Sequence, residues 1–323
     1  MSTKDEVLAI LEQKNTTNIS GQKIAEVLGI SRTAVWKAIN TLKEEGYRIH
    51  STKSTGYRLL ESSDSLNSAA IQPFLRKKLN VKTYQTIDST NAEAKRRLND
   101  NPNEDFLVIS EHQEAGRGRL GRKFYSPSRN GIYMSLGLHK LSPNNDATLI
   151  TTAAAVAVCR AIEELTPLKP QIKWVNDIFV AGKKVCGILT EGILNLETQT
   201  MQAIILGIGI NVIEDEQLPE DLQTIVGALF KDESPISRNT LAASVINHFY
   251  DVYETMGNRA FLEDYRARCF VLGKPVSFTK NNQLYRGFAT GIDDTGALEI
   301  RLDDQTYTKI SYGEISLDWR NAK

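Results

Sequence analysis

The chain has 323 residues, of which 41% are hydrophobic and 24% charged, and its 39 Lys and Arg balance its 39 Asp and Glu. These values exclude a mostly disordered chain, a fibrous repeat and a disulfide scaffold, and the length favours two or three domains. Three scattered cysteines without CxxC spacing and four scattered histidines predict no bound metal and a reducing compartment. No segment resembles a signal peptide or a membrane span, so we expect a cytoplasmic protein with no membrane partner.

Residues 1–62 are predicted to form a winged helix-turn-helix domain. The first sixty residues carry nine Lys and Arg against six Asp and Glu. Ser20 and Ser31 suit the N-caps of two short helices, and Gly29 suits the left-handed residue that ends the first of them. Residues 47–60 indicate two short strands that form a wing. A three-helix domain that binds no DNA is the alternative to a DNA-binding domain. The side chains predicted to contact DNA are Arg32, Thr33, Lys37 and Lys53.

A polar, serine-rich segment at residues 61–68 separates this domain from a predicted central domain at residues 66–271. Residues 66–79 are expected to form a helix that bends at Pro73. The predicted strands then cover residues 81–85, 106–111, 132–138, 172–174, 178–180, 185–191 and 201–208. The predicted helices cover residues 89–98, 147–165, 239–256 and 260–270. Because several strands follow one another as hairpins, this pattern predicts an α+β mixed sheet and not a doubly wound one. Short strands in residues 272–323 predict an SH3-like β-barrel.

The segment Gly-Arg-Gly-Arg-Leu-Gly at residues 116–121 matches the GxGxxG pattern. A dinucleotide site would need a helix directly after it, but residues 122–131 include Pro127 and Gly131 and cannot form a good helix. Without that helix, the segment is predicted to be a flexible loop. A solvated basic loop is one interpretation, and a loop that orders around a phosphate or carboxylate is the other. The cations that would bind such an anion are Arg117, Arg119, Arg122 and Lys123.

Lys184 follows a predicted turn and begins a buried strand. A lysine in that place can meet an anion in a poorly solvated site, although a surface lysine in a hairpin is the simpler alternative. Asp177 lies between apolar strand residues in the sequence Lys-Trp-Val-Asn-Asp. Gly207 and Gly209, which precede Asn211, leave the strand surface without side chains, so a flat ligand could lie close to the backbone there.

Five motifs occur in one order along the chain: Asp-Ser-Thr-Asn at 88–91, Gln113 with the GRGRLGR loop, the KWxND motif at 173–177, Lys184 with Gly187, and GxGxN at 207–211. Together with the terminal domains, this set resembles the bifunctional biotin–protein ligases, also called biotin operon repressors. The resemblance implies that biotin and MgATP form biotinoyl-5′-adenylate and pyrophosphate. The adenylate then acylates a lysine of a biotin carboxyl carrier domain of acetyl-CoA or pyruvate carboxylase. It also implies repression at operator DNA. Because an operator read by a winged helix usually has two half-sites, and ligand would order the arginine-rich loop, we expect a homodimer promoted by ligand.

The resemblance also implies roles for individual residues. The residues implied to bind biotin or the adenylate are Ser89, Thr90, Asn91, Gln113, Gly116, Arg117, Gly118, Arg119, Arg122, Phe124, Lys184, Gly187 and Asn211. Lys184 would contact the biotin carboxylate and the α-phosphate, and Arg119 would order the loop. Asp177 would either hold Mg²⁺ or accept a proton from the attacking lysine. The rival functions are a ligand-sensing repressor without catalysis and a lipoate ligase.

This chain departs from the family pattern at two positions. Val175 stands where the KWxND motif usually has proline, which changes the rigidity of the local turn. Phe124 stands where the family often has a tryptophan that stacks on adenine, and a phenyl ring offers a smaller stacking surface.

Overall fold

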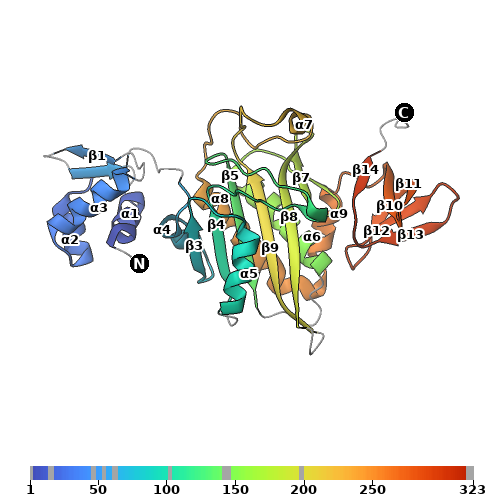
Figure 1. Ribbon diagram of the computed structural model, residues 1–323, viewed down its shortest axis with the longest axis horizontal. Helices are drawn as coiled ribbons and strands as arrows, with labels where there is room; N and C mark the ends of the chain where they lie inside the picture. Colours follow the sequence, from blue (N-terminus) through green and yellow to red (C-terminus); the bar gives the residue numbers. More distant parts are fainter. Residues whose placement is uncertain are drawn as a thin grey trace.

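The computed structural model describes residues 3–13, 18–44, 49–52, 56–59, 65–100, 104–139, 147–195 and 200–317. A small helical unit, a large central domain built on a sheet, and a C-terminal β domain follow one another along the longest axis (Figure 1). In the part of the chain that the structure describes, no helix combines the length and the apolarity that crossing a bilayer requires.

The N-terminal unit confirms the predicted winged helix-turn-helix. It contains α1 (Thr3–Gln13), α2 (Gly21–Leu28), α3 (Arg32–Glu44) and the antiparallel strands β1 (Ile49–Thr52) and β2 (Gly56–Leu59). The Ser20 hydroxyl accepts a hydrogen bond from Lys23 N at 3.1 Å, and Gly29 ends α2 with φ 66°. The apolar sides of the three helices pack together and form a hydrophobic core that is separate from the core of the central domain. Its fully buried members include Val7, Leu11, Ile24, Val35, Ile39 and Leu42.

Glu12, near the end of α1, is largely withdrawn from water, and burial raises its pKa from 4.5 to about 7. The folded state therefore favours the protonated carboxyl, and this contribution to stability is lost as the pH rises from about 4.5 to about 7. We expect Glu12→Gln to raise the free energy of unfolding relative to wild type at pH 8, on the order of 1–3 kcal/mol, with little difference at pH 4. Hydrogen exchange of the α1 amides at the two pH values would measure this, and an equal effect at both would contradict the assignment.

The central sheet has seven strands in the order β3-β4-β5-β9-β8-β7-β6. The strands are β3 (Asn80–Tyr84), β4 (Phe106–Ser110), β5 (Gly131–Leu138), β6 (Gln171–Lys173), β7 (Asp177–Val180), β8 (Lys183–Asn195) and β9 (Thr200–Asn211). Among the strands that the structure describes in this sheet, only β3 and β4 pair in parallel, so the predicted mixed sheet is confirmed.

Helices cover both faces of the central sheet (Figure 1). One face packs against α6 (Ala147–Leu165) and α8 (Arg238–Thr255), and α9 (Phe261–Arg268) follows α8 through a short 3₁₀ turn, η3 (Met256–Asn258). The other face packs against α5 (Thr90–Asp100), whose Ala94 and Leu98 share one buried apolar cluster with Val108 and Ile205 of the sheet. A single helical turn, α7 (Glu220–Gln223), lies in the connection after β9.

The helix predicted at residues 66–79 is wrong in extent. The structure has only α4 (Ser68–Ile71) and a 3₁₀ turn, η1 (Gln72–Phe74). Pro73 has no N–H to donate to the helix, so the α-helical hydrogen bonds end before it; Gln72 keeps helical angles, and the chain becomes extended at Leu75 after the 3₁₀ turn. Asn247 of α8 then binds the extended chain, because its side chain accepts from Arg76 N at 2.9 Å and donates to Phe74 O at 2.8 Å.

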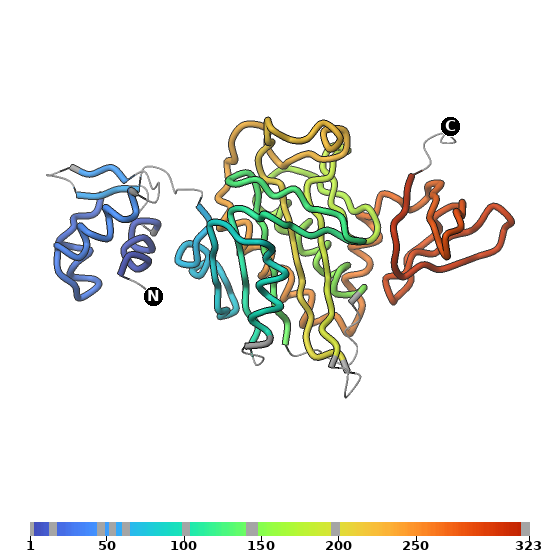
Figure 2. The backbone as a smooth tube through the Cα atoms, viewed as in Figure 1, coloured from blue at the N-terminus to red at the C-terminus, as the bar shows by residue number. Residues whose placement is uncertain are grey.

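The C-terminal domain is a five-stranded antiparallel sheet in the order β13-β12-β11-β10-β14. Its strands are β10 (Pro275–Lys280), β11 (Gln283–Ile292), β12 (Leu298–Leu302), β13 (Tyr307–Ile310) and β14 (Ile315–Leu317). The backbone trace shows this domain at the opposite end of the molecule from the N-terminal unit (Figure 2). The domain shares one buried apolar cluster with the central domain, and the Trp174 indole donates to Gly296 O at 3.0 Å across the junction. The two domains are therefore packed together.

Candidate functional site

A cavity opens between the arginine-rich loop, the strands β7 to β9 and the start of α5. The predicted residues that line it are Ser89, Thr90, Asn91, Gln113, Arg117, Gly118, Arg119, Arg122, Phe124, Asp177, Lys184 and Gly187. We call it the first cavity. It draws residues from three regions of the sequence because the parallel pair β3–β4 brings the N-terminus of α5 beside the loop after β4. The loop itself contains a short 3₁₀ turn, η2 (Arg119–Gly121).

The floor of the first cavity near α5 is a buried polar network. Ser89, Thr90 and Asn91 are all at most 5% exposed. The Gln113 amide oxygen accepts from Thr90 N at 2.8 Å and from Thr90 Oγ1 at 3.0 Å. The Asn91 amide donates to Glu191 at 2.6 Å, and its oxygen accepts from Ser135 at 2.6 Å. Since these groups are held by one another, the network presents fixed donors and acceptors to a polar ligand.

Gly207 and Gly209 line the first cavity, as the sequence predicts, but the space above each of them is shared with side chains of the protein. A Cβ atom at Gly207 would collide with the Asn91 side chain, and one at Gly209 would lie 2.5 Å from the Phe124 ring. A Cβ at Gly187 would also lie 3.1 Å from that ring. These glycines therefore make room for two side chains of the protein itself, and those side chains form the cavity wall.

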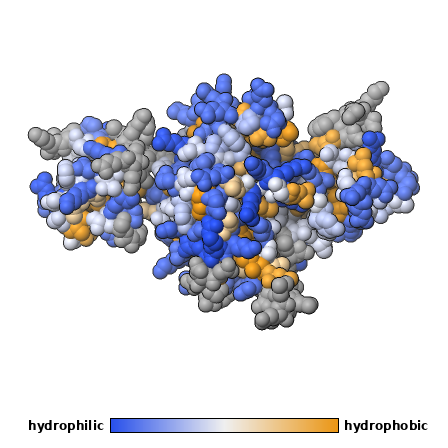
Figure 3. All heavy atoms as spheres, in the orientation of Figure 1, coloured by the Kyte–Doolittle hydropathy of each residue, from blue (hydrophilic) through white to orange (hydrophobic). Residues whose placement is uncertain are grey.

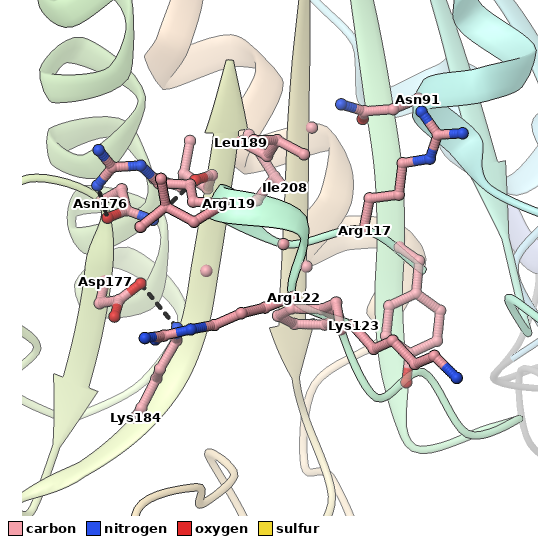
Figure 4. Close-up of a pocket in the computed structure, with 18 of the residues that line it drawn as sticks. Asn91, Arg117, Arg119, Arg122, Lys123, Asn176, Asp177, Lys184, Leu189 and Ile208 are labelled. Atoms are coloured by element: carbon pink, nitrogen blue, oxygen red, sulfur yellow. Dashed lines mark hydrogen bonds and ion pairs between the residues drawn. The ribbon is translucent and has the colours of Figure 1, made fainter. Parts of the chain in front are cut away.

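Cations and their partners gather on the opposite side of the first cavity (Figure 4). Nζ of Lys184 lies 2.8 Å from Oδ1 of Asp177, and both side chains are about one quarter exposed, at 26% and 22%. Arg119 donates to the Asn176 side-chain oxygen at 2.9 Å. Figure 4 also shows the Arg122 side chain reaching toward this pair, whereas Arg117 lies on the Asn91 side. The site therefore presents positive charge to an anion, and a single aspartate offsets the Lys184 charge.

Arg122 joins the loop to the C-terminal domain. Its guanidinium makes two hydrogen bonds to the Glu314 carboxylate, at 2.7 and 2.6 Å, and this pairing raises the pKa of Arg122. Glu314 also lines the first cavity, although sequence reasoning missed it. No local signal could have found it, because it is 192 residues away from Arg122 along the chain.

A second cavity adjoins the first and contains Asn211, whose amide donates to Gly227 O at 3.0 Å. The residues that line both cavities are Arg122, Lys123, Phe124, Tyr133 and Lys184. Lys184 and Phe124 therefore stand at the junction of two neighbouring spaces. Gly116 lines neither cavity, because it lies at the base of the loop, where a Cβ would be 2.5 Å from Phe124 O.

The three cysteines are buried and free, and burial raises the pKa of the Cys159 and Cys269 thiols to about 12. Thiolates are the reactive form, so these two groups are not suited to be nucleophiles. In the N-terminal unit, Arg32, Thr33 and Lys37 are exposed on α3. Lys53, the wing residue predicted to contact DNA, lies outside the described residues.

Three family models match this chain in the order of its domains. An HTH domain matches residues 3–58, the biotin/lipoate A/B protein ligase family matches residues 83–211, and the biotin protein ligase C-terminal domain matches residues 271–318. The bifunctional ligase/repressor BirA of Bacillus subtilis is 33% identical over 93% of this chain and 94% of its own length. The Escherichia coli protein of the same description is 30% identical over 92% of each chain.

This chain belongs to the bifunctional biotin–protein ligase and repressor family. A solved biotin protein ligase from Aquifex aeolicus, in complex with biotin and ATP, superposes with a TM-score of 0.61 at 27% identity. It covers 74% of this chain and 98% of its own length. The family fold expected from the sequence is thereby confirmed, including the SH3-like C-terminal domain.

The structure shows what surrounds the two residues that depart from the family pattern. Val175 is buried, follows a cis peptide bond, and its carbonyl oxygen accepts a hydrogen bond from the Tyr265 hydroxyl at 3.0 Å. Phe124 packs edge-on against Tyr133, with ring centroids 6.3 Å apart, and extends over Gly187 and Gly209. In this ligase, Phe124 therefore lies at the cavity junction where a stacking ring would be useful.

Proposed function

We propose that the first cavity binds biotin and the second binds the adenosine of ATP, so that the two substrates react beside Lys184. The observation that carries this proposal is that Lys184, Arg122 and Phe124 line both cavities. The biotin carboxylate attacks the α-phosphorus, pyrophosphate leaves, and the acyl-adenylate spans the junction. A carrier lysine then attacks the carbonyl carbon, loses a proton and releases AMP.

The individual roles follow from position. The buried network of Ser89, Thr90, Asn91 and Gln113 binds the polar part of biotin, and Arg117 with Gly118 closes over it. Arg119 holds the loop through Asn176, and Asn211 contacts adenine. Lys184 and Arg122 balance the charge that develops between carboxylate and phosphate, because positioned cations are the main catalytic contribution in this chemistry.

The Mg²⁺ that accompanies ATP is usually held in proteins by one or two carboxylates and by phosphate oxygens. Asp177 supplies a carboxylate beside the junction, which fits that pattern. Among the described residues, no three His, Cys, Asp or Glu side chains form a cluster that could hold a metal on its own. Asp177 is equally placed to receive the proton of the attacking lysine.

Incubation of the protein with biotin, ATP and a purified biotin carboxyl carrier domain tests this function by mass spectrometry. The ligase gives a biotinylated carrier, whereas a ligand-sensing repressor leaves the carrier unmodified. Lipoate supplied in place of biotin tests the lipoate ligase alternative: a biotin ligase modifies the carrier only with biotin. We place this reaction in the cytoplasm, where ATP, the carboxylase carriers and operator DNA are available together.

The repressor function predicts that Arg32→Ala or Lys37→Ala weakens operator binding and leaves ligation unchanged. Both residues are exposed on α3, far along the chain from the cavities. If each contacts a phosphate, the plot of log affinity against log salt loses about 0.9 of slope per replacement. Gel-shift titrations at several salt concentrations measure this slope. Loss of ligase activity in either variant would contradict the separation of the domains.

We also propose that the ligand promotes dimerisation. Leu120 in the loop is 74% exposed and has φ 56°, and Leu194 of β8 and Met201 of β9 are also exposed. Figure 3 shows an apolar patch near the lower end of the central domain. A loop ordered by the adenylate lowers the entropic cost of association. We expect biotin plus ATP to strengthen self-association and operator binding together, by about 1–3 kcal/mol. Sedimentation measures self-association, and gel shifts measure operator binding. The proposal is wrong if the apo protein dimerises and binds operator as well as the liganded protein does.

A further inference from the structure

The Trp36 side chain lies on the exposed face of α3, the second helix of the helix-turn-helix, and it was not among the predicted DNA contacts. Trp36 of α3 is 55% exposed. Its neighbours Val35, Ile39 and Leu42 are at most 1% exposed and form the domain core. Trp36 therefore adds nothing to that core, and because a single exposed apolar side chain is common on proteins, its neighbours decide what it could contact.

The surroundings of Trp36 indicate what that partner is. Arg32 and Thr33 are exposed four and three residues before Trp36, so they share a helix face with it, and the exposed Lys37 is the next residue along the helix. No acidic residue occurs in α3 before Glu44. A helix face that presents cations beside an aromatic ring is complementary to a nucleic acid, which is anionic. It is not complementary to a protein surface that lacks acidic residues.

The position of Trp36 along the helix favours base contact over backbone contact. It is the fifth residue of α3, in the N-terminal half that enters the major groove in helix-turn-helix proteins. The last-turn lysine is engaged elsewhere, because Lys43 Nζ donates to Ser51 Oγ of β1 at 2.6 Å. The wing is thus attached at the C-terminal end of α3, and the N-terminal half is left for DNA.

We propose that Trp36 is a specificity residue that reads thymine by packing its indole on the C5-methyl group in the major groove. The thymine methyl is the apolar group that the major groove offers to a side chain. This inference rests on the repressor function, and it adds sequence discrimination to the phosphate contacts of Arg32 and Lys37.

The test uses a duplex selected from a random library by the wild-type protein with biotin and ATP. Trp36→Ala is expected to weaken binding to this duplex about tenfold or more, without changing the salt slope, because no charge is lost. Lys37→Ala should lower the slope by about 0.9. Val27→Ala, on α2, is the matched control: Val27 is also apolar and 59% exposed, and its replacement should change neither quantity.

Thymine-to-uracil replacements in the selected duplex identify the contact, because they remove only the methyl group. At one position in each half-site, wild type should lose about fourfold in affinity per methyl, the scale for one buried carbon. Trp36→Ala should be indifferent to the same replacement. Trp36→Gln keeps a polar chain of moderate size, and it should behave like Trp36→Ala if the apolar surface matters.

Three results would overturn this inference while leaving repression intact. Trp36→Ala could bind the selected duplex as tightly as wild type, or both proteins could lose affinity equally on uracil replacement. In the third, Trp36→Ala weakens binding to random and selected duplexes alike, so Trp36 has no role in specificity. If the wild-type protein selects no duplex from the library, the repressor function is contradicted, and this inference, which rests on it, is contradicted too. Unchanged thermal unfolding of the variant shows that the domain remains folded.

Discussion

Replacement of Lys184 by alanine is expected to slow adenylate formation by about a hundredfold or more, the scale for losing one oriented donor to transition-state charge. Lys184 lines both cavities, and its ammonium lies 2.8 Å from Asp177. The replacement removes the cation and also leaves the Asp177 carboxylate facing two incoming anions. Single-turnover release of pyrophosphate measures the rate, and biotin binding alone should weaken less.

Two further variants separate charge from position. Lys184→Arg keeps the charge on a longer and planar group, so it should recover part of the rate but not all of it. Lys184→Ala combined with Asp177→Asn removes both charges of the pair, and it should bind ATP better than the single variant. Lys95→Ala, at an exposed position on α5, is the control. Normal adenylate formation by Lys184→Ala would contradict the catalytic role of Lys184 and leave it as a surface lysine of the hairpin.

The features that the sequence predicts well are those whose causes are local. Ser20 and Gly29 act within one helical turn of themselves, so their residue types were enough to place both ends of α2. The cations of the loop are adjacent in sequence, and their common position needed no tertiary information. Alternating apolar residues likewise identified β5, which is buried along its whole length.

The features that the sequence did not reveal depend on partners far away. The end of α4 is set partly by Asn247, which is 171 residues from Arg76. Glu314 reaches the loop from the C-terminal domain. Gly207 and Gly209 indicated that a side chain was absent, but they carried no signal that Asn91 and Phe124 occupy the space. A residue pattern shows where space is available, and only the packed chain shows what fills it.

The second large effect concerns a buried ion pair that sequence reasoning also missed. Arg238, at the start of α8, is 2% exposed, and Glu111, directly after β4, is 3% exposed. The Arg238 guanidinium donates to the Glu111 carboxylate at 2.9 and 3.2 Å and to Gly131 O at 2.8 Å. Glu111 also accepts from Leu66 N at 2.5 Å, where the chain enters the central domain. This pair therefore joins α8, β5 and the linker to the strand that precedes the loop.

We expect Glu111→Ala to lower the free energy of unfolding by about 3–5 kcal/mol, because it removes the buried carboxylate that accepts two hydrogen bonds from the Arg238 guanidinium and one from Leu66 N. Arg76 and Asp251 form the matched exposed pair, 2.7 Å apart with side chains 60% and 45% exposed. Asp251→Ala should therefore cost less than about 1 kcal/mol. Urea denaturation of both variants measures the difference.

The combination of Glu111→Leu with Arg238→Met tests the physical cause of this loss. It replaces both charges by apolar groups of similar size, so it should recover part of the stability that Glu111→Ala loses. Full recovery is not expected, since Leu66 N and Gly131 O would lose their side-chain partners. If Glu111→Ala were no more destabilising than Asp251→Ala, the Arg238 charge would have to reach water or another acceptor, and burial would not be the reason that the two residues are paired.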